Sequence, residues 1–225
     1  LLELQGQQGS SAVLDFRLPS MHSEAGSTYI PVLREDCPDF SSSLYTSSLA
    51  TRSLGRLLVY VPCLTTSQAA LSPALGHGAA VVPGRQTLGR GRGGNTWLSP
   101  PGCAMFSLQA LLASCSSLAS RPSLLQHLAA LALVQAVTDT TGLRLAIKWP
   151  NDIYLGQGVK VGGVVAAAST SSRGLLVSLG AGLNLDNSLP TTSVNRVVRE
   201  QGGQEVTREL FLATVFNRLE ELLDR

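Results

Sequence analysis

Two strand-like apolar runs separated by only a short turn limit the fold of this chain more than any other feature of its sequence. Residues 161–168 and 175–179 are rich in Val, Ala and Leu, and Ser171-Ser172-Arg173-Gly174 between them has the small and polar residues of a turn. Two strands joined so closely are expected to pair as an antiparallel hairpin. The hairpin favours a sheet with antiparallel pairs over a doubly wound sheet, in which each strand is followed by a helix.

The rest of the hydrophobic pattern adds further strands but only two clear helices. Short apolar or alternating runs predict strands at 57–61, 79–82, 104–112 and 143–147. Pro122 is suited to the first turn of a helix. The expected apolar face of that helix consists of Leu124, Leu125, Leu128, Leu131 and Ala132. Thr207 can cap a last helix, in which apolar residues recur at i, i+3, i+4 and i+7. Strands interrupted by one or two helices predict an α+β fold with a mixed sheet.

Residues 1–50 differ in composition from the remainder of the chain. They are rich in Ser, Gly and Gln and show no sustained periodicity, so we expect a low-complexity, partly ordered extension. Residues 51–225 are expected to form one domain, because a chain of 225 residues with 44% hydrophobic side chains can bury a single sizeable core. Because the chain begins at Leu1 rather than Met, we expect it to be an interior fragment of a longer protein.

Composition argues against several classes of protein. The longest strongly apolar stretch, residues 124–137, is interrupted by polar side chains and is shorter than the ~20 residues that a membrane span needs. The four cysteines form no CxxC pair and have no metal-ligand spacing with the three histidines, which argues against a disulfide framework or a zinc site. We therefore expect no membrane partner, no metal site made by protein ligands, and a reducing compartment.

Charge is distributed unevenly along the chain, although the net charge is only +2. No Asp or Glu occurs from Phe40 to Thr138, whereas several arginines do, so this segment is expected to carry a positive field. Lys148 and Lys160 are the only lysines, and their closeness in the sequence suggests a functional role. A compositional preference for arginine would explain the same observation. A net charge this small does not by itself imply a nucleic-acid partner.

The segment Gly89-Arg90-Gly91-Arg92-Gly93-Gly94 has the character of an anion site. Its four glycines let backbone N–H groups approach a ligand, and its two guanidinium groups add permanently charged, forked donors for a phosphate or a carboxylate. A plain glycine-rich hairpin turn is the alternative interpretation. A nucleic-acid contact through the Arg-Gly repeat is less favoured, because such repeats are long and disordered and this one lies between apolar strands.

The same six residues also match the GxGxxG pattern of dinucleotide-binding domains. That pattern requires a helix that starts in the loop and an acidic residue about 20 positions later. Here Trp97-Leu98-Ser99-Pro100-Pro101 is a poor helix start, and the next acid is Asp139. A Walker A loop is excluded as well, because neither lysine follows the required glycines.

Three further segments combine charged or amide groups with small residues. Lys148-Trp149-Pro150-Asn151-Asp152 supplies a cation, an amide and a carboxylate within five residues. Lys160-Val161-Gly162-Gly163 places a lysine beside two glycines that admit a ligand to the backbone. Gly180-Ala181-Gly182-Leu183-Asn184 has small residues suited to a pocket wall, with Asn184 at its polar end. A strand-ending turn for the first segment and simple packing for the last are the structural alternatives.

Together and in this order, GRGRGGNTWLSP, KWPND, KVGG and GAGLN closely resemble the motifs of the biotin–protein ligase family, whose animal members are called holocarboxylase synthetases. The resemblance extends from about Leu54 to Arg225. It implies a mixed, mostly antiparallel β-sheet with helices packed on one side, of the class II synthetase type. It also implies that the end of the family's catalytic domain and its SH3-like cap domain lie outside this chain.

The resemblance carries site residues over to matching positions. Gly89 to Gly94 corresponds to the loop that folds over biotinyl-5′-adenylate, with Arg90 and Arg92 facing the biotin carboxylate and the nucleotide phosphate. Lys160 corresponds to the family's essential lysine, and Asp152 to a carboxylate near the approaching acceptor lysine. The expected catalytic residues are Lys160, Arg92 and Asp152. The expected residues for binding biotin and ATP are Thr66, Ser67, Gln86, Gly89, Arg90, Gly91, Arg92, Gly94, Trp97, Lys148, Asn151, Lys160, Gly163 and Asn184.

Some of these residues have expected subsites as well. Thr66 and Ser67 correspond to the hydroxyl pair that hydrogen-bonds the ureido ring of biotin, although the acidic residue that usually precedes this pair is missing here. Gln86 and Gly89 correspond to positions that line the biotin pocket, and the backbone of Gly163 to one that approaches biotin. Trp97, Asn151 and Asn184 correspond to positions near the nucleotide.

The implied activity is ATP-dependent activation of biotin to biotinyl-5′-AMP, followed by transfer of biotin to a specific lysine of a biotin carboxyl carrier domain of a carboxylase. Mg²⁺ is expected through the ATP phosphates. Cytoplasmic or mitochondrial localisation and a homodimer are further expectations. A lipoate–protein ligase would share the fold and the adenylation chemistry, although the GRGRGG and KWPND segments favour biotin. A catalytically inactive biotin-binding or regulatory fragment is the other alternative.

Overall fold

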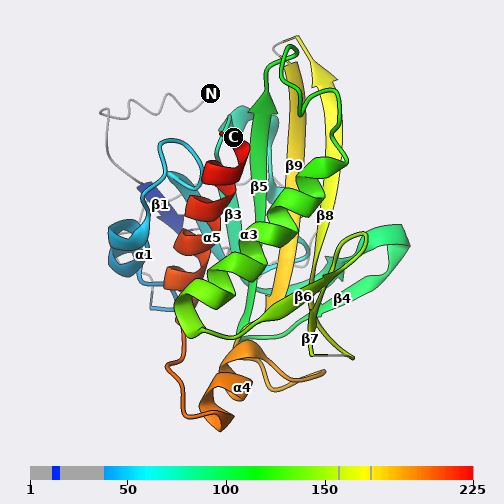
Figure 1. Ribbon diagram of the computed structural model, residues 1–225. Coiled ribbons are helices and arrows are strands. Elements are labelled where there is room, and N and C mark those ends of the chain that lie inside the picture. Colours follow the sequence, from blue (N-terminus) through cyan, green and yellow to red (C-terminus); the bar gives the residue numbers. More distant parts are fainter. Residues whose placement is uncertain (1–11, 16–37, 157, 173, 225) are drawn as a thin grey trace.

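The computed structural model describes residues 12–15, 38–156, 158–172 and 174–224. Within them the chain forms a nine-stranded sheet in the order β1-β2-β3-β5-β9-β8-β7-β6, and β4 pairs with β3 beside this path (Figure 1). The strands are β1 (Ala12–Asp15), β2 (Leu57–Leu64), β3 (Ala80–Arg90), β4 (Thr96–Ser99), β5 (Cys103–Leu112), β6 (Leu145–Lys148), β7 (Asp152–Leu155), β8 (Val159–Ser171) and β9 (Gly174–Asn184). The helices are α1 (Ser42–Ser48), α2 (Ser67–Ala70), α3 (Leu124–Thr141), α4 (Val194–Glu200) and α5 (Arg208–Leu223). Short 3₁₀ turns span Pro73–Leu75 and Arg92–Gly94.

Antiparallel pairing dominates the sheet. β2 is parallel to both β1 and β3, and the other paired strands run antiparallel. The predicted hairpin is confirmed, because β8 and β9 pair from Gly162 opposite Leu183 to Ser171 opposite Gly174. Both strands are longer than their apolar runs indicate. The α+β fold class with a mixed, mostly antiparallel sheet is therefore confirmed.

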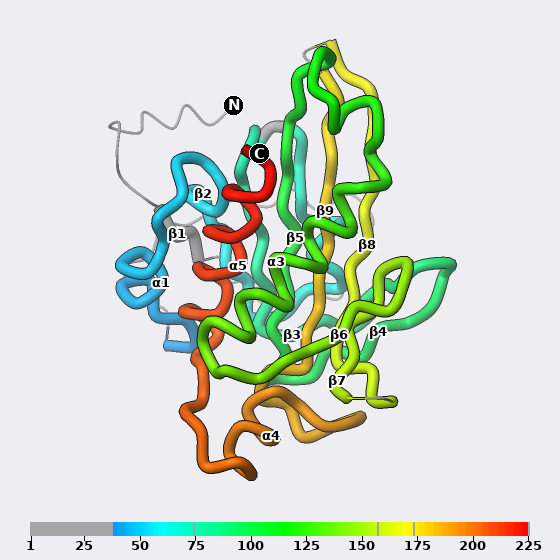
Figure 2. Tube along the Cα trace, viewed as in Figure 1, coloured from blue at the N-terminus to red at the C-terminus, as the bar shows by residue number. Residues whose placement is uncertain are grey.

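The two long helices, α3 and α5, cover one face of the sheet (Figures 1 and 2). Phe106 of β5 and Phe216 of α5 are both buried, and their ring centroids lie 5.0 Å apart in an edge-to-face arrangement. Such a pair contributes about 0.5–1.5 kcal/mol beyond the burial of its area. On the opposite face, the one-turn helix α2 packs near a smaller apolar cluster formed by Val59, Val61 and Val81. The main core therefore lies between the sheet and the long helices.

The predicted apolar face of α3 is wrong in part. The helix begins at Leu124, two residues after Pro122, whose carbonyl accepts the Leu125 N–H at 3.1 Å. Leu124 itself is exposed, whereas Leu128 and Leu131 are half-buried. The buried residues are Leu125, Ala129, Ala130, Ala132, Leu133, Ala136 and Val137. Because apolar residues surround this helix on nearly all sides, the sequence period does not single out the face that meets α5 and the sheet.

Part of the Ser-, Gly- and Gln-rich region packs into the domain. Tyr45 of α1 is fully buried, donates its hydroxyl to the Gly55 carbonyl at 2.8 Å and meets Phe216 edge-on. Burial raises the pKa of Tyr45 above its usual value. Residues 1–11 and 16–37 of the predicted extension lie outside the described residues, and the division at residue 50 stays a prediction.

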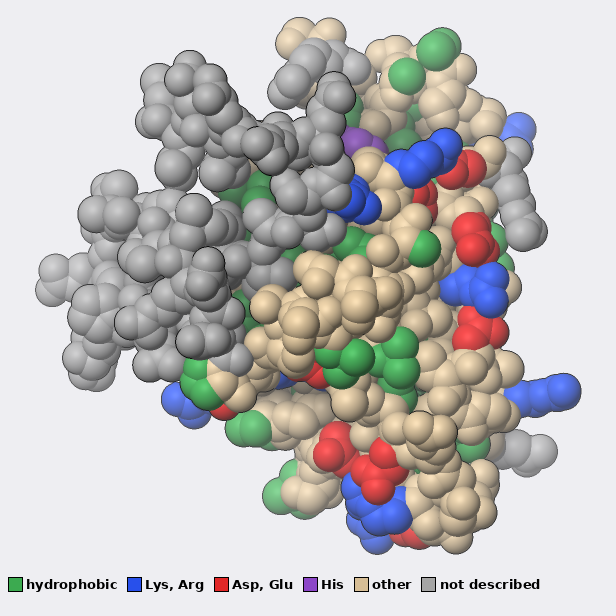
Figure 3. Space-filling view, turned by 90° about the vertical axis from the view of Figure 1, so that its left-hand side faces the viewer, with side chains coloured by type: hydrophobic (Ala, Val, Ile, Leu, Met, Phe, Trp, Pro, Cys, Tyr) green, Lys and Arg blue, Asp and Glu red, His purple; other side chains and the backbone are tan. Residues whose placement is uncertain are grey.

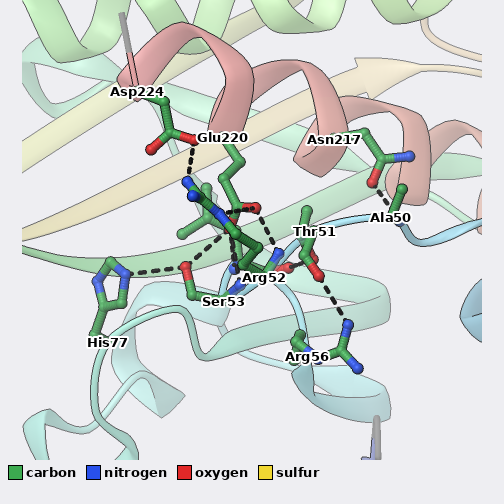
Figure 4. Close-up of polar contacts among 10 residues, drawn as sticks. Ala50, Thr51, Arg52, Ser53, Arg56, His77, Asn217, Glu220 and Asp224 are labelled. Carbon is green, nitrogen blue, oxygen red and sulfur yellow. Dashed lines mark hydrogen bonds and ion pairs between the residues drawn. The ribbon is translucent and has the colours of Figure 1, made fainter. Parts of the chain in front are cut away.

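The last helix fixes the segment that leads into β2 (Figure 4). The Glu220 carboxylate accepts the backbone N–H groups of Arg52 at 2.5 Å, Ser53 at 2.9 Å and Leu54 at 2.9 Å, and also the Ser53 hydroxyl at 2.9 Å. Burial alone would raise the pKa of Glu220, but these hydrogen bonds outweigh it and hold the pKa below its usual value. A single carboxylate thus ties the entry of the central sheet to α5.

Two further observations concern the helices of the described residues and the charge on one face of the molecule. Across the described ranges, no helix is both long enough and apolar enough to cross a membrane. On the face shown in Figure 3, the coloured acidic and basic side chains lie beside one another rather than in a patch of one sign.

Candidate active site

A cavity of about 520 Å³ opens on the face of the sheet opposite α3 and α5. Its lining comes from α2, the turn between β3 and β4, the start of β7, and the middle of β8 and β9. Gly163 and Val165 of β8 lie opposite Gly182 and Gly180 of β9 in the ladder, so these four residues share one side of the sheet. Val164 alternates with them and belongs to the main core, and it also lines part of the cavity. β8 therefore contributes residues to both the core and the cavity.

Two glycines of β9 are required by what packs on them. A Cβ at Gly182 would lie 2.7 Å from the indole Nε1 of Trp97, and a Cβ at Gly180 would lie 2.8 Å from Nε2 of Gln68. Both separations are too short for a non-bonded contact, so these side chains rest directly on the strand backbone. The Trp97 Nε1 is buried and has no hydrogen-bond partner within the described part of the chain. As expected from the small residues of this segment, Gly180, Ala181 and Gly182 line the cavity.

The glycine- and arginine-rich segment is the turn of a β-hairpin. β3 continues to Arg90, and after the turn β4 runs back beside it. The Gly91 N–H donates to the Asn95 carbonyl at 2.7 Å, and Gly93 and Gly94 have φ values of +67° and +83°, in the region that favours glycine. A strand rather than a helix follows the loop, which removes the dinucleotide-binding interpretation. The segment is a hairpin turn, as one interpretation had it, and it also lines the cavity.

The cavity lining carries an excess of positive charge. Arg90 and Arg92 are exposed, and their side chains make no ion pair or hydrogen bond with any other described residue. The Lys160 Nζ lies 2.7 Å from Oδ1 of Asp152 and 5.8 Å from the ring centroid of Trp97. Two free guanidinium groups and a lysine against one carboxylate favour a ligand with several negative charges.

The short β6–β7 hairpin positions the polar residues of the KWPND segment. Lys148 lies opposite Asp152 in the ladder, and the turn between the strands presents Trp149, which is 78% exposed. Asn151 is buried and donates its Nδ2 to the Val164 carbonyl at 2.8 Å, so its side chain is held against β8. Lys148 instead lies 5.3 Å over a neighbouring tyrosine ring of β7 and does not line the cavity.

Polar groups connect α2 to β3, β4 and β5 at one end of the cavity. The Ser67 N–H donates to Oε1 of Gln86 at 2.6 Å, and Nε2 of Gln86 donates to Oγ of Ser99 at 3.1 Å. The hydroxyl oxygens of Ser67 and Ser107 lie 2.8 Å apart. Thr66 precedes α2 without capping it, so its buried hydroxyl is available to a ligand.

The structure brings most of the expected site residues together. Those that line the cavity are Thr66, Ser67, Gln86, Arg90, Gly91, Arg92, Trp97, Asn151, Asp152, Lys160 and Gly163. Those that the lining does not include are Gly89, Gly94, Lys148 and Asn184. Gly89 supports the hairpin, because a Cβ there would lie 2.5 Å from the Trp97 carbonyl oxygen. The buried Asn184 donates its Nδ2 to Oγ1 of Thr191 at 2.9 Å, away from the cavity.

Several lining residues have no predicted role, namely Gln68, Asn95, Thr96, Phe106, Val164 and Val165. The first three directly follow the hydroxyl pair or the glycine-rich turn, so their position next to a motif could have indicated that they lie in the site. Phe106, Val164 and Val165 carried no signal, because an apolar residue in a strand looks like a core residue.

Comparison with known proteins shows to which proteins the chain is similar. The model of the biotin/lipoate A/B protein ligase family matches residues 62–184. The chain is 34% identical over 204 residues to biotin–protein ligase 2 of Arabidopsis thaliana. The aligned region covers 86% of this chain and 60% of that protein. It is 32% identical over 198 residues to the biotin–protein ligase of Homo sapiens, covering 82% of this chain and 27% of that protein. It is 36% identical over 166 residues to the biotin–[acetyl-CoA-carboxylase] ligase of Paracoccus denitrificans, covering 68% of each.

Solved structures give the same fold. The biotin protein ligase of Aquifex aeolicus in complex with biotin and ATP has a TM-score of 0.60 and 26% identity, over 75% of this chain and 70% of that one. The biotin protein ligase of Leishmania major in complex with biotinyl-5-AMP has a TM-score of 0.62 over 75% of each chain, and at 22% identity it supports the fold alone.

Proposed function

The chain belongs to the biotin/lipoate A/B protein ligase family, and from that membership we propose that it activates biotin with ATP and transfers the biotinyl group to a lysine of a carboxylase. The observation that carries the proposal is the cavity, whose lining combines Arg90, Arg92 and Lys160 with the hydroxyl-bearing Thr66 and Ser67. Its volume of about 520 Å³ lies within the roughly 300–1,000 Å³ typical of small-molecule sites. The names of the Arabidopsis, human and Paracoccus relatives support biotin as the acid.

In the first step, a carboxylate oxygen of biotin bonds to the α-phosphorus of ATP while the bond to the bridging oxygen breaks and pyrophosphate leaves. The reaction brings two anions into contact, a repulsion of about 4 kcal/mol for unit charges 4 Å apart near a protein surface. Arg90, Arg92 and Lys160 offset this repulsion and the negative charge on the phosphoryl oxygens and the leaving pyrophosphate. Positioning and charge neutralisation suffice, so no side-chain nucleophile is needed.

Lys160 is held ready for that step by Asp152. The ion pair is partly exposed, with 41% of the lysine side chain and 26% of the aspartate side chain accessible. A pair of this exposure is weakly held, so an incoming triphosphate competes with the carboxylate for the ammonium group. When the lysine turns to the phosphates, Asp152 is released for the second step.

Magnesium would be held through the phosphates of ATP and would neutralise part of their charge. Within the described residues, no group of three or more His, Cys, Asp or Glu side chains is arranged to hold a metal. Asp152 is the carboxylate of the cavity lining, and it is paired with Lys160. We propose that the nucleotide carries the ion into the site.

In the second step, the amine of an acceptor lysine attacks the acyl carbon of biotinyl-AMP, an amide bond forms and AMP leaves. The acceptor amine must first lose a proton from a reference pKa of about 10.4, and the Asp152 carboxylate orients it for that loss. The mixed anhydride would be hydrolysed by bulk water, so closure of the Gly93–Gly94 turn over it protects the intermediate.

The acceptor, the location and the assembly are part of the same proposal. We assign the acceptor lysine to a biotin carboxyl carrier domain, a choice that the name of the Paracoccus relative supports. We place the protein in the cytoplasm or mitochondria, although one Arabidopsis relative is named as chloroplastic. We also propose that two copies of the chain form a homodimer, and light scattering of the purified chain tests this by measuring its molecular mass.

Biotin-dependent exchange of labelled pyrophosphate into ATP tests the proposal, with lipoate and no-acid reactions as controls. Exchange with biotin alone would support it. Exchange with lipoate, or competition by lipoate, would move the chain to the lipoate branch of the family. Biotin binding without exchange would identify a binding fragment instead of an enzyme.

A further inference from the structure

Ser107 of β5 lies next to the cavity but not in its wall. It is fully buried, and it faces Gly180 of β9 in the ladder. Its Oγ lies 2.8 Å from Oγ of Ser67, which does line the cavity. Ser107 can therefore influence a ligand only through Ser67.

The direction of the hydrogen bond between the two serines follows from what each hydroxyl can reach. Among the described residues, the Ser107 hydroxyl has one hydrogen-bond partner, the Ser67 oxygen. A fully buried hydroxyl proton without an acceptor is costly, so Ser107 donates and Ser67 accepts. The proton of the Ser67 hydroxyl is then left for the cavity.

Gln86 does not compete for that proton. Its Oε1 already accepts the Ser67 N–H at 2.6 Å, and its Nε2 donates to Ser99 and to the sulfur of Met105, at 3.1 and 3.4 Å. These contacts set the orientation of the amide and leave the Ser67 hydroxyl unbonded to it. The hydroxyl proton faces the cavity, and one of the two lone pairs on the oxygen is occupied by Ser107.

We infer that Ser107 is a positioning residue that fixes the Ser67 hydroxyl as a hydrogen-bond donor, so that the site selects an acid whose ring carries a carbonyl oxygen. The inference rests on the proposed function and specifies its ligand. The cyclic urea of biotin presents such an oxygen, whereas the dithiolane ring of lipoate offers only sulfur, a weak acceptor. A site built to make a hydrogen bond strongly rejects a ligand that cannot complete it.

Titration calorimetry on the full chain tests the assignment with biotin, 2-iminobiotin and lipoate. In 2-iminobiotin the ring oxygen is replaced by an imine that is protonated at neutral pH and can only donate. We expect wild type to prefer biotin and Ser107→Ala to lower the ratio of biotin to 2-iminobiotin affinity at least tenfold, because the freed Ser67 hydroxyl can rotate and accept. Ser107→Thr, which keeps the hydroxyl, should restore the ratio.

The matched control is Ser178→Ala, the same substitution on β9 at a position that does not line the cavity. It should leave both affinities at wild-type values. If Ser107→Ala weakens both ligands equally and leaves the ratio unchanged, Ser107 is merely structural and the assignment is overturned while the proposed function stands. If wild type binds no biotin, the proposed function and the assignment both fall, and the wild-type measurement alone shows it.

Discussion

The ammonium nitrogen of Lys160 lies 2.7 Å from a carboxylate oxygen of Asp152 because a β-bulge turns the lysine toward the cavity. In the ladder between β7 and β8, Asp152 pairs with Gly163 and Tyr154 pairs with Lys160. The two pairs are two residues apart on β7 but three residues apart on β8, so β8 contains one extra residue between them. In a regular ladder Lys160 would face Leu155 and point to the helix side of the sheet. The extra residue on β8 brings it to the side of Asp152 and Tyr154 instead. The local irregularity thus places the cation of the KVGG segment in the site.

Replacing Lys160 with Ala should suppress formation of biotinyl-AMP. The substitution removes a preformed positive charge from the reacting phosphate, and loss of one such electrostatic contact typically costs about 10²–10³ in rate. The measurement is biotin-dependent pyrophosphate exchange at saturating ATP. Arg144→Ala is the control, because Arg144 is exposed and outside the cavity lining. An unchanged exchange rate in Lys160→Ala would remove Lys160 from the first step.

Replacing Arg92 with Ala should let the adenylate escape before transfer. Arg92 lies in the hairpin turn, lines the cavity and has no partner for its side chain among the described residues. Loss of a hydrogen bond to a charged ligand group costs about 1.5–3 kcal/mol, which corresponds to a dwell time shorter by roughly ten- to a hundredfold. Rapid filtration of a single turnover with labelled ATP and no acceptor measures the dwell time. A dwell time equal to that of wild type would contradict the role of the turn.

Replacing Gly182 with Ala should displace Trp97 and weaken ATP binding. The new Cβ would lie 2.7 Å from Nε1 of Trp97, and overpacking of this kind costs about 1–3 kcal/mol. We expect a KM for ATP about tenfold higher, with a changed tryptophan emission spectrum. Gly158→Ala is the matched control, because a Cβ there meets nothing within 4 Å and its φ is not in the left-handed region. A normal KM in Gly182→Ala would mean that the indole does not shape the nucleotide site.

The sequence predicts those parts of the structure that depend on local pattern. The β8–β9 hairpin follows from two apolar runs and a turn, and the last helix follows from its cap at Thr207 and its regular period. The buried face of α3 depends on tertiary contacts, because its sequence is apolar on nearly all sides. The side to which Lys160 points depends on a bulge that no residue type announces. No pattern in the sequence points to Ser107, because its proposed role depends on contact with Ser67, forty positions away.

The Glu220 carboxylate should make the free energy of unfolding depend on pH at values below the usual pKa of a glutamate side chain. Its pKa is lowered in the folded protein, because the hydrogen bonds from residues 52–54 outweigh the effect of burial. A lowered folded pKa contributes stability that is fully present above the unfolded value of about 4.3 and is lost as pH falls through the folded value. We expect Glu220→Gln to lower the free energy of unfolding by about 1.5–3 kcal/mol at pH 7, and we expect this gap to shrink as pH falls through the lowered pKa of the folded protein. Urea unfolding of both proteins at each pH measures it, and Glu221→Gln, an exposed site on the same helix, should change stability by less than about 0.5 kcal/mol. A gap that does not change with pH down to the acid unfolding of both proteins would mean that Glu220 acts through shape alone rather than through its charge.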